Sequence, residues 1–414
     1  MEKKVRVLDY IEEWAMKIKK NFIFRLFYII LFLLFCRNVI VIYPLYNIYI
    51  VDRIYSYVAL AVGSVFIAWF LYTHLCHTAN VFFIILFKTV LEIFSNIING
   101  GTMKVPIMSF IYPCALYCFA IYITEKKRLD YFIKDISIFF LILSTINLLL
   151  MGPQGNFYRD LQYFLGLKNQ ISFTLLLGLY FSWLNSIYND KKITLILYII
   201  IYLVSSIIIG SASGMVSVII FLLINLIPYV KKIIQKLSTQ IFPLIIIGIV
   251  LFLVFYTLFG IENNFIKWFV VDVLKKDLTF TGRTKIWSIL LKNMNHYFLF
   301  GHGAPENSNI FYIDGQTLSA HNTFLAVLYN GGIACVCITI LLVFVATKYI
   351  DKIQSERIKM VHKIMLLLIS IPMLSENVSM NSLYIILFIG VGISVNLIKT
   401  KNKRLLQGEK YYDS

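Results

Sequence analysis

The chain has 414 residues, of which 59% are hydrophobic and 14% charged, and its mean hydropathy is +0.80. These values exclude an ordinary soluble domain, in which about a quarter of the residues are charged. The formal net charge is +17, and its distribution along the chain decides whether it reports on membrane topology or on a nucleic-acid partner.

Apolar runs long enough to cross a membrane recur along most of the chain. A run of about 20 apolar residues spans a hydrocarbon core of roughly 30 Å, and by this criterion the sequence contains about twelve spans. The sequence therefore predicts an all-α polytopic membrane protein. The expected spans are 22–43, 56–75, 80–98, 106–123, 131–151, 170–188, 193–210, 214–230, 239–260, 321–347, 364–380 and 382–398. The last two can also be one broken span, because Pro372 and Glu376 interrupt the apolar pattern.

Lysine and arginine gather in alternate connections between these spans. Because cytoplasmic loops carry the excess of Lys and Arg, the alternation predicts an even number of spans with both termini in the cytoplasm. The positive charge then reports on topology and attracts the anionic lipids of the bilayer, and no nucleic-acid partner is expected. The expected regions are a cytoplasmic tail (1–21), a transmembrane domain (22–398) and a basic cytoplasmic tail (399–414). The basic segments contain Lys3, Lys4, Arg6, Lys17, Lys19 and Lys20; Lys126, Lys127 and Arg128; Lys191 and Lys192; Lys231, Lys232 and Lys236; Lys348, Lys352, Arg357, Lys359 and Lys363; and Lys399, Lys401, Lys403, Arg404 and Lys410.

Two connections are expected on the outer face, a short one at 152–169 and a long one at 261–320. The long loop precedes the last three spans. Its residues 264–276 and 283–294 have apolar residues at helical spacing, which predicts two amphipathic helices, the first lying at the membrane interface. Most of the chemistry that the sequence offers is therefore expected in this loop.

The stretch Leu278 to Trp287, LTFTGRTKIW, places two cations beside a glycine in the long outer loop. We interpret Thr281 as a helix N-cap, and Arg283 and Lys285 as residues of the first helical turn. Cations are unfavourable there because a helix N-terminus already carries partial positive charge, so an anion is expected nearby. Free N–H groups, a glycine and an arginine able to bind two oxygens predict a phosphate site. The alternative is that both cations extend to anionic lipid headgroups.

A histidine opens the next span at the end of the same loop. His321 and Asn322 are expected at the outer mouth of the helix, and a glycine pair at 331–332 is expected to allow close helix packing. A neutral imidazole is a natural general base, although a histidine at a membrane boundary can also be an interfacial polar residue. A zinc site made of His296, His302 and His321 is disfavoured, because their spacing matches no usual signature.

The order of these motifs resembles the O-antigen ligase and Wzy polymerase superfamily, which includes capsular polysaccharide polymerases. The resemblance implies a GT-C-like fold with a large helical outer loop. It also implies glycosyl transfer on the outer face of a bacterial cytoplasmic membrane from a polyprenyl diphosphate-linked oligosaccharide. No metal and no other cofactor is implied, while flippase and chain-length regulator proteins are implied partners. The motifs are Gly-Arg-x-x-x-Trp at Gly282, Arg283 and Trp287, Gly-x-Gly at Gly301 and Gly303, His-Asn at His321 and Asn322, Gly-Gly-Ile at 331–333 and, more weakly, GLKNQ at 166–170.

The same resemblance assigns roles to individual residues. Arg283 stabilises the diphosphate leaving group, and His321 accepts the proton of the attacking sugar hydroxyl. One departure is that Ala212 follows Ser211 where the family commonly has an arginine, and Arg159 is the expected replacement. The further residues expected to contact substrate are Gly282, Lys285, Arg159, Lys168, Asn169, His302 and Asn322.

Three functions remain open from the sequence. A polymerase adds the growing glycan to another lipid-linked repeat unit, whereas a ligase transfers a finished glycan to a different acceptor. We favour the polymerase because only short basic tails flank the spans. A non-enzymatic flippase or exporter is the rival of another class, and it should concentrate its cations among the spans rather than in the loops. Within the spans, Lys88 and Glu92 lie four residues apart and predict either a structural ion pair or a role in substrate passage.

Overall fold

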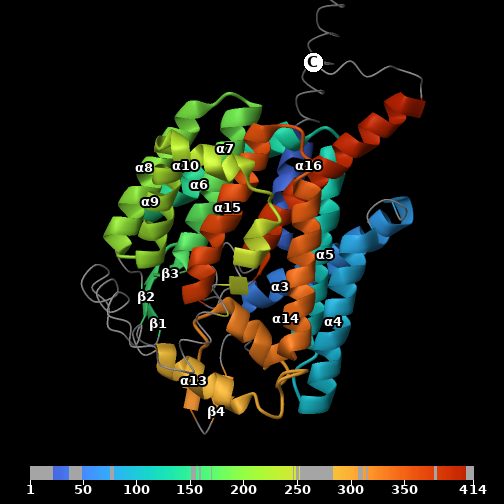
Figure 1. The fold of residues 1–414 in the computed structure, drawn as a ribbon, viewed down its shortest axis with the longest axis vertical. Helices are drawn as coiled ribbons and strands as arrows, with labels where there is room; N and C mark the ends of the chain where they lie inside the picture. Colours follow the sequence, from blue (N-terminus) through green and yellow to red (C-terminus); the bar gives the residue numbers. More distant parts are fainter. Residues whose placement is uncertain are drawn as a thin grey trace, which may run out of the picture.

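The computed structural model is built from long helices that run side by side (Figure 1). It describes residues 22–36, 49–74, 79–150, 155–157, 160–168, 170–245, 247–248, 251, 283–305, 311–313, 316–376 and 380–406. Among these residues, seven helices are long and apolar enough to cross a membrane, or up to eight if a bent pair counts as one span. The seven are α3 (Tyr49–His74), α4 (Ala79–Asn99), α5 (Lys104–Glu125), α6 (Leu129–Leu149), α7 (Ile171–Tyr188), α8 (Lys192–Ile209) and α14 (Thr323–Ile350). The fold is thus that of a polytopic, predominantly α-helical membrane protein, as predicted.

Further helices overlap the other expected spans, while α10 (Pro228–Lys236) covers the basic connection expected after the span 214–230. The bent pair is α9 (Ala212–Leu226) and α10, which meet at 94°. α15 (Glu356–Ser375) and α16 (Asn381–Leu406) are two helices, so the last expected spans are not one continuous helix. Apolar helix also covers Phe22–Phe35 and residues 241–245. The count of twelve spans stays a prediction.

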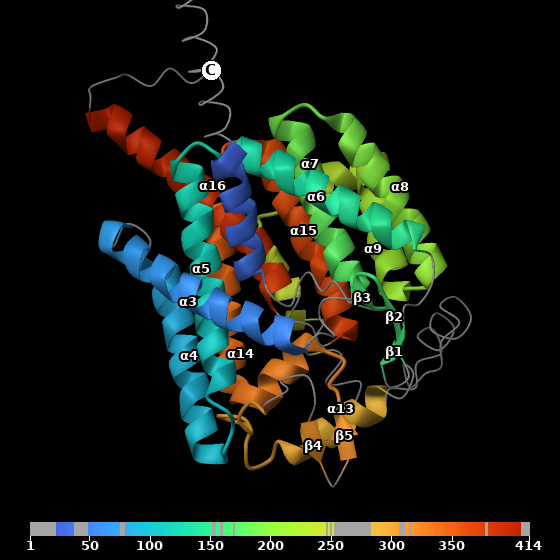
Figure 2. The same ribbon diagram turned by 180° about the vertical axis from the view of Figure 1, so that it is seen from behind.

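The expected cytoplasmic connections lie together at one end of the bundle. The α5–α6, α7–α8 and α14–α15 connections are at the top of Figure 1, and each contains lysine with further basic residues in the adjoining helix ends or the connection itself. The opposite end, called here the loop end, carries the β1–β3 sheet, α13 (Arg283–Asn293) and the β4–β5 hairpin, and Figure 2 shows the same arrangement from behind. The alternation of basic connections in the sequence therefore corresponds to two physical ends of the molecule.

Helices at the centre and at the edge of the bundle differ in which faces are buried. α7 is mostly apolar and is buried on nearly all sides, and its Tyr180 and Phe181 are fully buried. α8, at the periphery, exposes Ile193 and Ile207, which are 73% and 64% accessible. A helix that is hydrophobic all round belongs in the interior of a bundle or against lipid, and these two helices show both cases.

Both outer loops contain short β-strands, which the sequence alone did not predict. In the short loop, β1 (Gly155–Phe157), β2 (Asp160–Tyr163) and β3 (Gly166–Leu167) form an antiparallel sheet in chain order. In the long loop, β4 (Phe311–Ile313) pairs with β5 (Gln316–Leu318) as a hairpin. Strand pairing satisfies the backbone groups of segments that have no helical apolar pattern. The predicted helix at 283–294 is confirmed as α13, while 264–276 and Thr281 lie outside the described residues.

The glycine pair of α14 breaks the helix instead of packing it against a neighbour, so that prediction was wrong for Gly332. Gly332 has φ 69° and ψ −175°, a conformation that is essentially restricted to glycine. Gly301 packs against it, and Ile333 N–H donates to Phe298 O at 2.9 Å. Backbone carbonyls of the preceding loop thus accept hydrogen bonds from N–H groups that the broken helix does not pair internally. Residues 323–331 form a separate outer segment.

Candidate active site

Three side chains from distant parts of the sequence meet at the loop end. Arg283 Nη2 donates to Glu376 Oε1 at 2.6 Å, and His321 Nδ1 lies 3.7 Å from Glu376 Oε2. The Glu376 side chain is 9% exposed, while those of Arg283 and His321 are 20% and 33% exposed. A buried carboxylate therefore holds an arginine and a histidine that both remain accessible.

Arg283 is fixed by the packing of α13 against the outer segment of α14. Trp287, one turn beyond Arg283, donates from Nε1 to Ala320 O at 2.7 Å, next to His321. The apolar face predicted for this helix is buried, and it forms one cluster with the outer segment of α14. The cluster contains Trp287, Leu290, Met294, Ala320, Leu325, Ala326 and Tyr329. The spacing of apolar residues in α13 thus sets where its first residue, Arg283, points.

The start of α14 is fastened to the end of α15. Asn322 caps α14, because its Oδ1 accepts from the N–H groups of Phe324 and Leu325 at 2.9 and 3.0 Å. Its Nδ2 donates to Leu374 O at 3.2 Å, and Thr323 Oγ1 donates to Glu376 O at 2.9 Å. These bonds hold His321 and Glu376 at a fixed separation. Asn322, predicted to contact substrate, has its side-chain amide engaged in this capping.

His321 has a backbone conformation that is rare for a residue with a side chain. Its φ is 43°, in the left-handed region, and it directly precedes the extended Asn322. Such conformations cost of order 1–3 kcal/mol and persist where the surroundings impose them, often at functional sites. The capping of α14 and the Trp287 bond impose it here, and they direct the imidazole towards Glu376.

The anion predicted near the first turn of α13 is present as a protein carboxylate. Glu376 neutralises Arg283, and it lies beside the N-terminus of α14, where partial positive charge also favours an anion. A guanidinium has five N–H donors, so this pair leaves Arg283 with donors for a second anion. A phosphate at Arg283 stays a prediction.

Glu376 is the residue of this site that the sequence reasoning missed. In the sequence alone, Glu376 is one of two residues that interrupt an apolar span. A carboxylate beside an apolar run is costly unless it is paired, and that cost was the available signal for a functional position. Only the tertiary structure shows that its partner is Arg283, 93 residues earlier in the chain.

Other predicted site residues lie elsewhere or are not described. Lys168 directly follows β3, and its side chain extends to Gly210 at the turn between α8 and α9, where a Cβ on Gly210 would lie 3.3 Å from Lys168 Nζ. It therefore places a cation close to Ala212, where the family's arginine is absent. Lys285 is exposed on α13. Arg159, Asn169 and Gly282 lie outside the described residues.

His302 is held by packing against aromatic rings. Its imidazole lies between the rings of Tyr297 and Tyr329, with centroids 3.9 and 4.4 Å away, and its Nε2 lies 3.0 Å from Asn293 O. Burial lowers the pKa of His302 below its ordinary value, and the bond to the carbonyl opposes this effect. These contacts keep the loop attached to α14, while the predicted contact of His302 with substrate stays a prediction.

Residues with carboxylate, imidazole or thiol groups are dispersed in the described part of the chain. No three of them lie close enough there to hold a metal ion. Lys88 and Glu92 do form the predicted i,i+4 ion pair, and Glu92 also accepts from Ser109 Oγ. This pair satisfies both charges inside the bundle, which agrees with a structural ion pair.

Together, the fold and the cluster at its loop end define a multi-pass membrane protein with a polar site at one end of the bundle. Residues 193–340 match the family model described as O-antigen ligase, which confirms the resemblance found in the sequence motifs. The matched segment contains Arg283 and His321, whereas Glu376 lies after it. The match supports O-antigen ligase- or polymerase-type activity on lipid-linked glycans, and it does not separate the two. Searches among curated proteins and among solved structures gave no match.

Proposed function

We propose that the chain is a polysaccharide polymerase that joins polyprenyl diphosphate-linked oligosaccharide repeat units. The observation that carries this proposal is the cluster of Arg283, Glu376 and His321 at the loop end. Two of these residues lie in the segment that matches the O-antigen ligase family. The loop end then faces the outside of a bacterial cytoplasmic membrane, because the basic connections lie at the other end.

In the proposed reaction, His321 accepts the proton of the attacking sugar hydroxyl. Its Nδ1 faces Glu376, so Nε2 is the atom left for the hydroxyl. The oxygen forms a bond to the anomeric carbon of the donor, and the bond from that carbon to the phosphate oxygen breaks. The nearby Glu376 carboxylate stabilises the imidazolium that forms, in the way that an acidic residue supports a histidine base in other enzymes.

Arg283 is proposed to stabilise the departing lipid diphosphate. Its charge is oriented before the reaction by Glu376, so little reorganisation is needed when negative charge develops on the leaving group. Lys168 and Lys285 are proposed as further contacts for the diphosphate. We propose that no metal is required, and the flippase and chain-length regulator stay proposed partners.

Reconstitution tests the proposal directly. Purified protein in vesicles, given lipid-linked repeat units and no flippase, should produce a ladder of longer glycans that persists in EDTA. Transbilayer movement of the substrate without a ladder would identify a flippase instead. Transfer to a different lipid acceptor without a ladder would identify a ligase.

Variants at the cluster should remove the ladder while the protein remains folded in the membrane. We expect His321→Ala and Arg283→Ala each to lower the rate by at least about 100-fold, as general-base and electrostatic groups typically contribute this much or more. Lys359→Ala, at the far end of α15, is the matched charge-removal control and should keep the wild-type rate. Full activity of either cluster variant would remove that residue from the mechanism.

A further inference from the structure

The long outer loop presents apolar side chains to its surroundings where it meets the end of α4. Phe298 and Leu299, in the turn that follows α13, are 53% and 55% exposed. The loop adjoins α4, because the ring centroids of Phe300 and Phe94 lie 4.9 Å apart, and both ribbon views show the loop beside the end of this helix (Figure 1, Figure 2). We call the exposed apolar side chains at this place the apolar lip, and each of them is between 44% and 65% exposed. They are Phe94, Ile97, Ile98, Phe298 and Leu299.

The opposite face of the same turns of α4 is polar and is bonded to the loop. Asn96 Oδ1 accepts from Ala304 N–H at 2.7 Å, and Asn99 Nδ2 donates to Gly301 O at 2.7 Å. The end of α4 thus directs its amide side chains into the protein and its apolar side chains outwards. A helix end in water is expected to show the reverse arrangement, so the lip faces an apolar medium.

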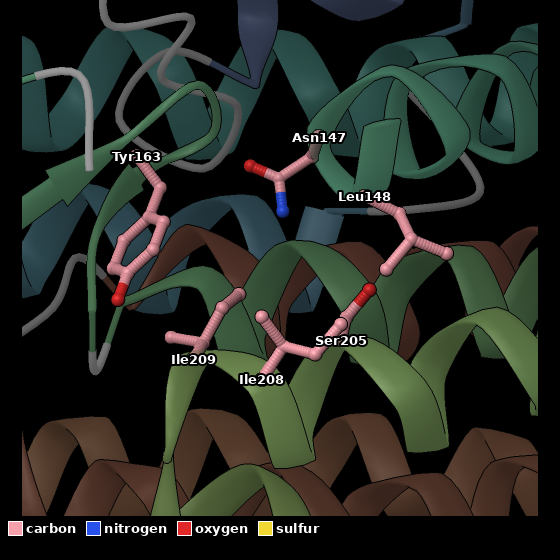
Figure 3. Close-up of a pocket in the computed structure, with 6 residues that line it drawn as sticks. All are labelled: Asn147, Leu148, Tyr163, Ser205, Ile208 and Ile209. Carbon is pink, nitrogen blue, oxygen red and sulfur yellow. The ribbon is translucent and has the colours of Figure 1, made fainter. Parts of the chain in front are cut away.

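The short outer loop is attached to its helix in the same way. Asn147, in the last turn of α6, accepts from Leu165 N–H at 3.0 Å and borders the small hollow between α6, α8 and β2 that Figure 3 shows. This hollow has room for about one water molecule. Leu149 and Leu150, at the same helix end, are 72% and 46% exposed. Two helix ends at the loop end therefore combine inward amides with outward apolar side chains, as expected near the boundary of a hydrocarbon core.

The break in α14 gives the depth of the lip in the membrane. Residues 333–350 form about 27 Å of helix at 1.5 Å per residue, and Lys348 and Asp351 mark the end of this helix at the basic side of the bundle. A hydrocarbon core is about 30 Å thick, so Gly332 lies no further out than its far boundary. Leu299 lies at the same depth, because a Cβ on Gly332 would be 2.3 Å from Leu299 O. The lip is therefore level with the hydrocarbon rather than above it.

The loop also meets the condition for irregular backbone at membrane depth. Such backbone is tolerated only where its polar groups bond within the protein, because lipid chains offer no partners. The carbonyls of residues 297–299 all accept from backbone N–H groups, at 2.6, 2.9 and 3.2 Å. The turn can therefore enter hydrocarbon without leaving these carbonyls unpaired. The donors are Gly301, Ile333 and Ala334.

We propose that the apolar lip is inserted into the bilayer leaflet at the loop end, in contact with lipid acyl chains. None of its five side chains is charged, and it continues the exposed surface of the span α4, where Phe83 and Phe87 are 58% and 53% exposed. Part of a loop expected on the outer face is thus a membrane-inserted element. The proposal uses only the crossing of a membrane by the bundle and not the proposed reaction.

Insertion of the lip has a consequence for the active site. Tyr297, next to the lip, packs on His302, and His302 packs on Tyr329. Tyr329 belongs to the apolar cluster that contains Trp287 of α13, the helix that begins at Arg283. The lip therefore fixes the height of Arg283 relative to the membrane surface.

Photo-crosslinking tests the proposal on the wild-type protein. The protein is placed in phospholipid vesicles that contain phosphatidylglycerol with a diazirine at the end of an acyl chain and no polyprenyl lipid. After illumination, mass spectrometry of peptides should find lipid adducts on residues 297–299 and on the last turns of α4. A water-soluble diazirine should not label residues 297–299. Absence of lipid adducts there, or labelling by the water-soluble reagent, would overturn the proposal.

A spin label measures the same property at single positions. Leu299→Cys carries the label in a background in which Cys76 and Cys337 are serine. Phe87→Cys, in the middle of α4, is the control in hydrocarbon, and Asn295→Cys, an exposed polar position of the same loop, is the control in water. The label at position 299 should resemble that at 87, with more access for oxygen than for a water-soluble nickel chelate, whereas the label at 295 should show the opposite order.

The other outcomes identify other occupants, and each would overturn the proposal. More nickel than oxygen access at position 299 would place the lip in water. Little access for either reagent would mean that protein, such as a second copy of the chain, covers the lip. Oxygen access that appears only after polyprenyl phosphate is added would make the lip a track for the lipid of the substrate. Lipid adducts in a protein that makes no glycan ladder would support the inserted lip and remove only the proposed polymerase.

Discussion

Replacing Glu376 with Gln removes the negative charge that lies beside both Arg283 and His321, and it preserves the shape of the side chain. The Arg283–Glu376 contact is 2.6 Å, and the two side chains are 20% and 9% exposed. A hydrogen bond to a charged group at such a site contributes about 1.5–3 kcal/mol. We therefore expect Glu376→Gln to destabilise the protein by about 1–2 kcal/mol, less than the whole contribution, because the amide still accepts one weaker bond from Arg283.

The chain offers a matched control with the same contact distance. Lys359 and Glu356 also pair at 2.6 Å with side chains 15% and 61% exposed, so the two pairs differ mainly in the exposure of the carboxylate. Exposed ion pairs contribute about 0.2–1 kcal/mol. Two double-mutant cycles measure the coupling free energy of each ion pair, with unfolding followed in the same mixed micelles. One cycle combines Arg283→Gln with Glu376→Gln, and the other combines Lys359→Gln with Glu356→Gln.

The buried pair should show a coupling of about 1.5–3 kcal/mol and the exposed pair less than about 1 kcal/mol. Equal couplings would refute the conclusion that burial of Glu376 fixes Arg283. If the transfer rate per folded molecule also falls in Glu376→Gln, the carboxylate has a further role in orienting His321.

Three further predictions concern the elements around the site. Gly332→Ala should destabilise the protein by at least about 2 kcal/mol in thermal unfolding, because the added Cβ would lie 2.3 Å from Leu299 O and the backbone conformation is reserved for glycine. The control Gly248→Ala should be neutral, because a Cβ at Gly248 meets open space. Asn322→Ala should cost about 1–2 kcal/mol through loss of the cap of α14, and Asn322→Ser, which keeps an uncharged capping oxygen, should recover part of it; equal losses would show that the cap is not the cause. Burial lowers the pKa of His302 in the folded state, so the neutral imidazole contributes stability above the ordinary pKa of about 6.5, and this contribution is lost as the pH falls below that value. Hydrogen exchange of residues 297–304, corrected for intrinsic rates, should therefore speed up from about pH 7.5 to about pH 5.5. The His302→Phe variant should not show this acceleration.

The sequence determined the class of the protein and the elements with a strong local pattern. Apolar runs of spanning length and the alternation of basic connections predicted the helices and the two ends of the bundle, because both signals depend on composition within one segment. The apolar spacing after Arg283 predicted α13 for the same reason. Arg283 and His321 could be selected as site residues because each borders a recognisable element.

The tertiary structure decided which residues meet and what the glycines do. Arg283 and Glu376 are 93 residues apart, and neither position carries a local signal for the other. Gly332 breaks α14 because the backbone of the loop at Leu299 packs against it, a contact that helical periodicity does not encode. Likewise, β4 and β5 exist through pairing with each other, since three residues have too little pattern to specify a strand. Local pattern thus fixed the elements, whereas long-range contacts fixed the site that they form.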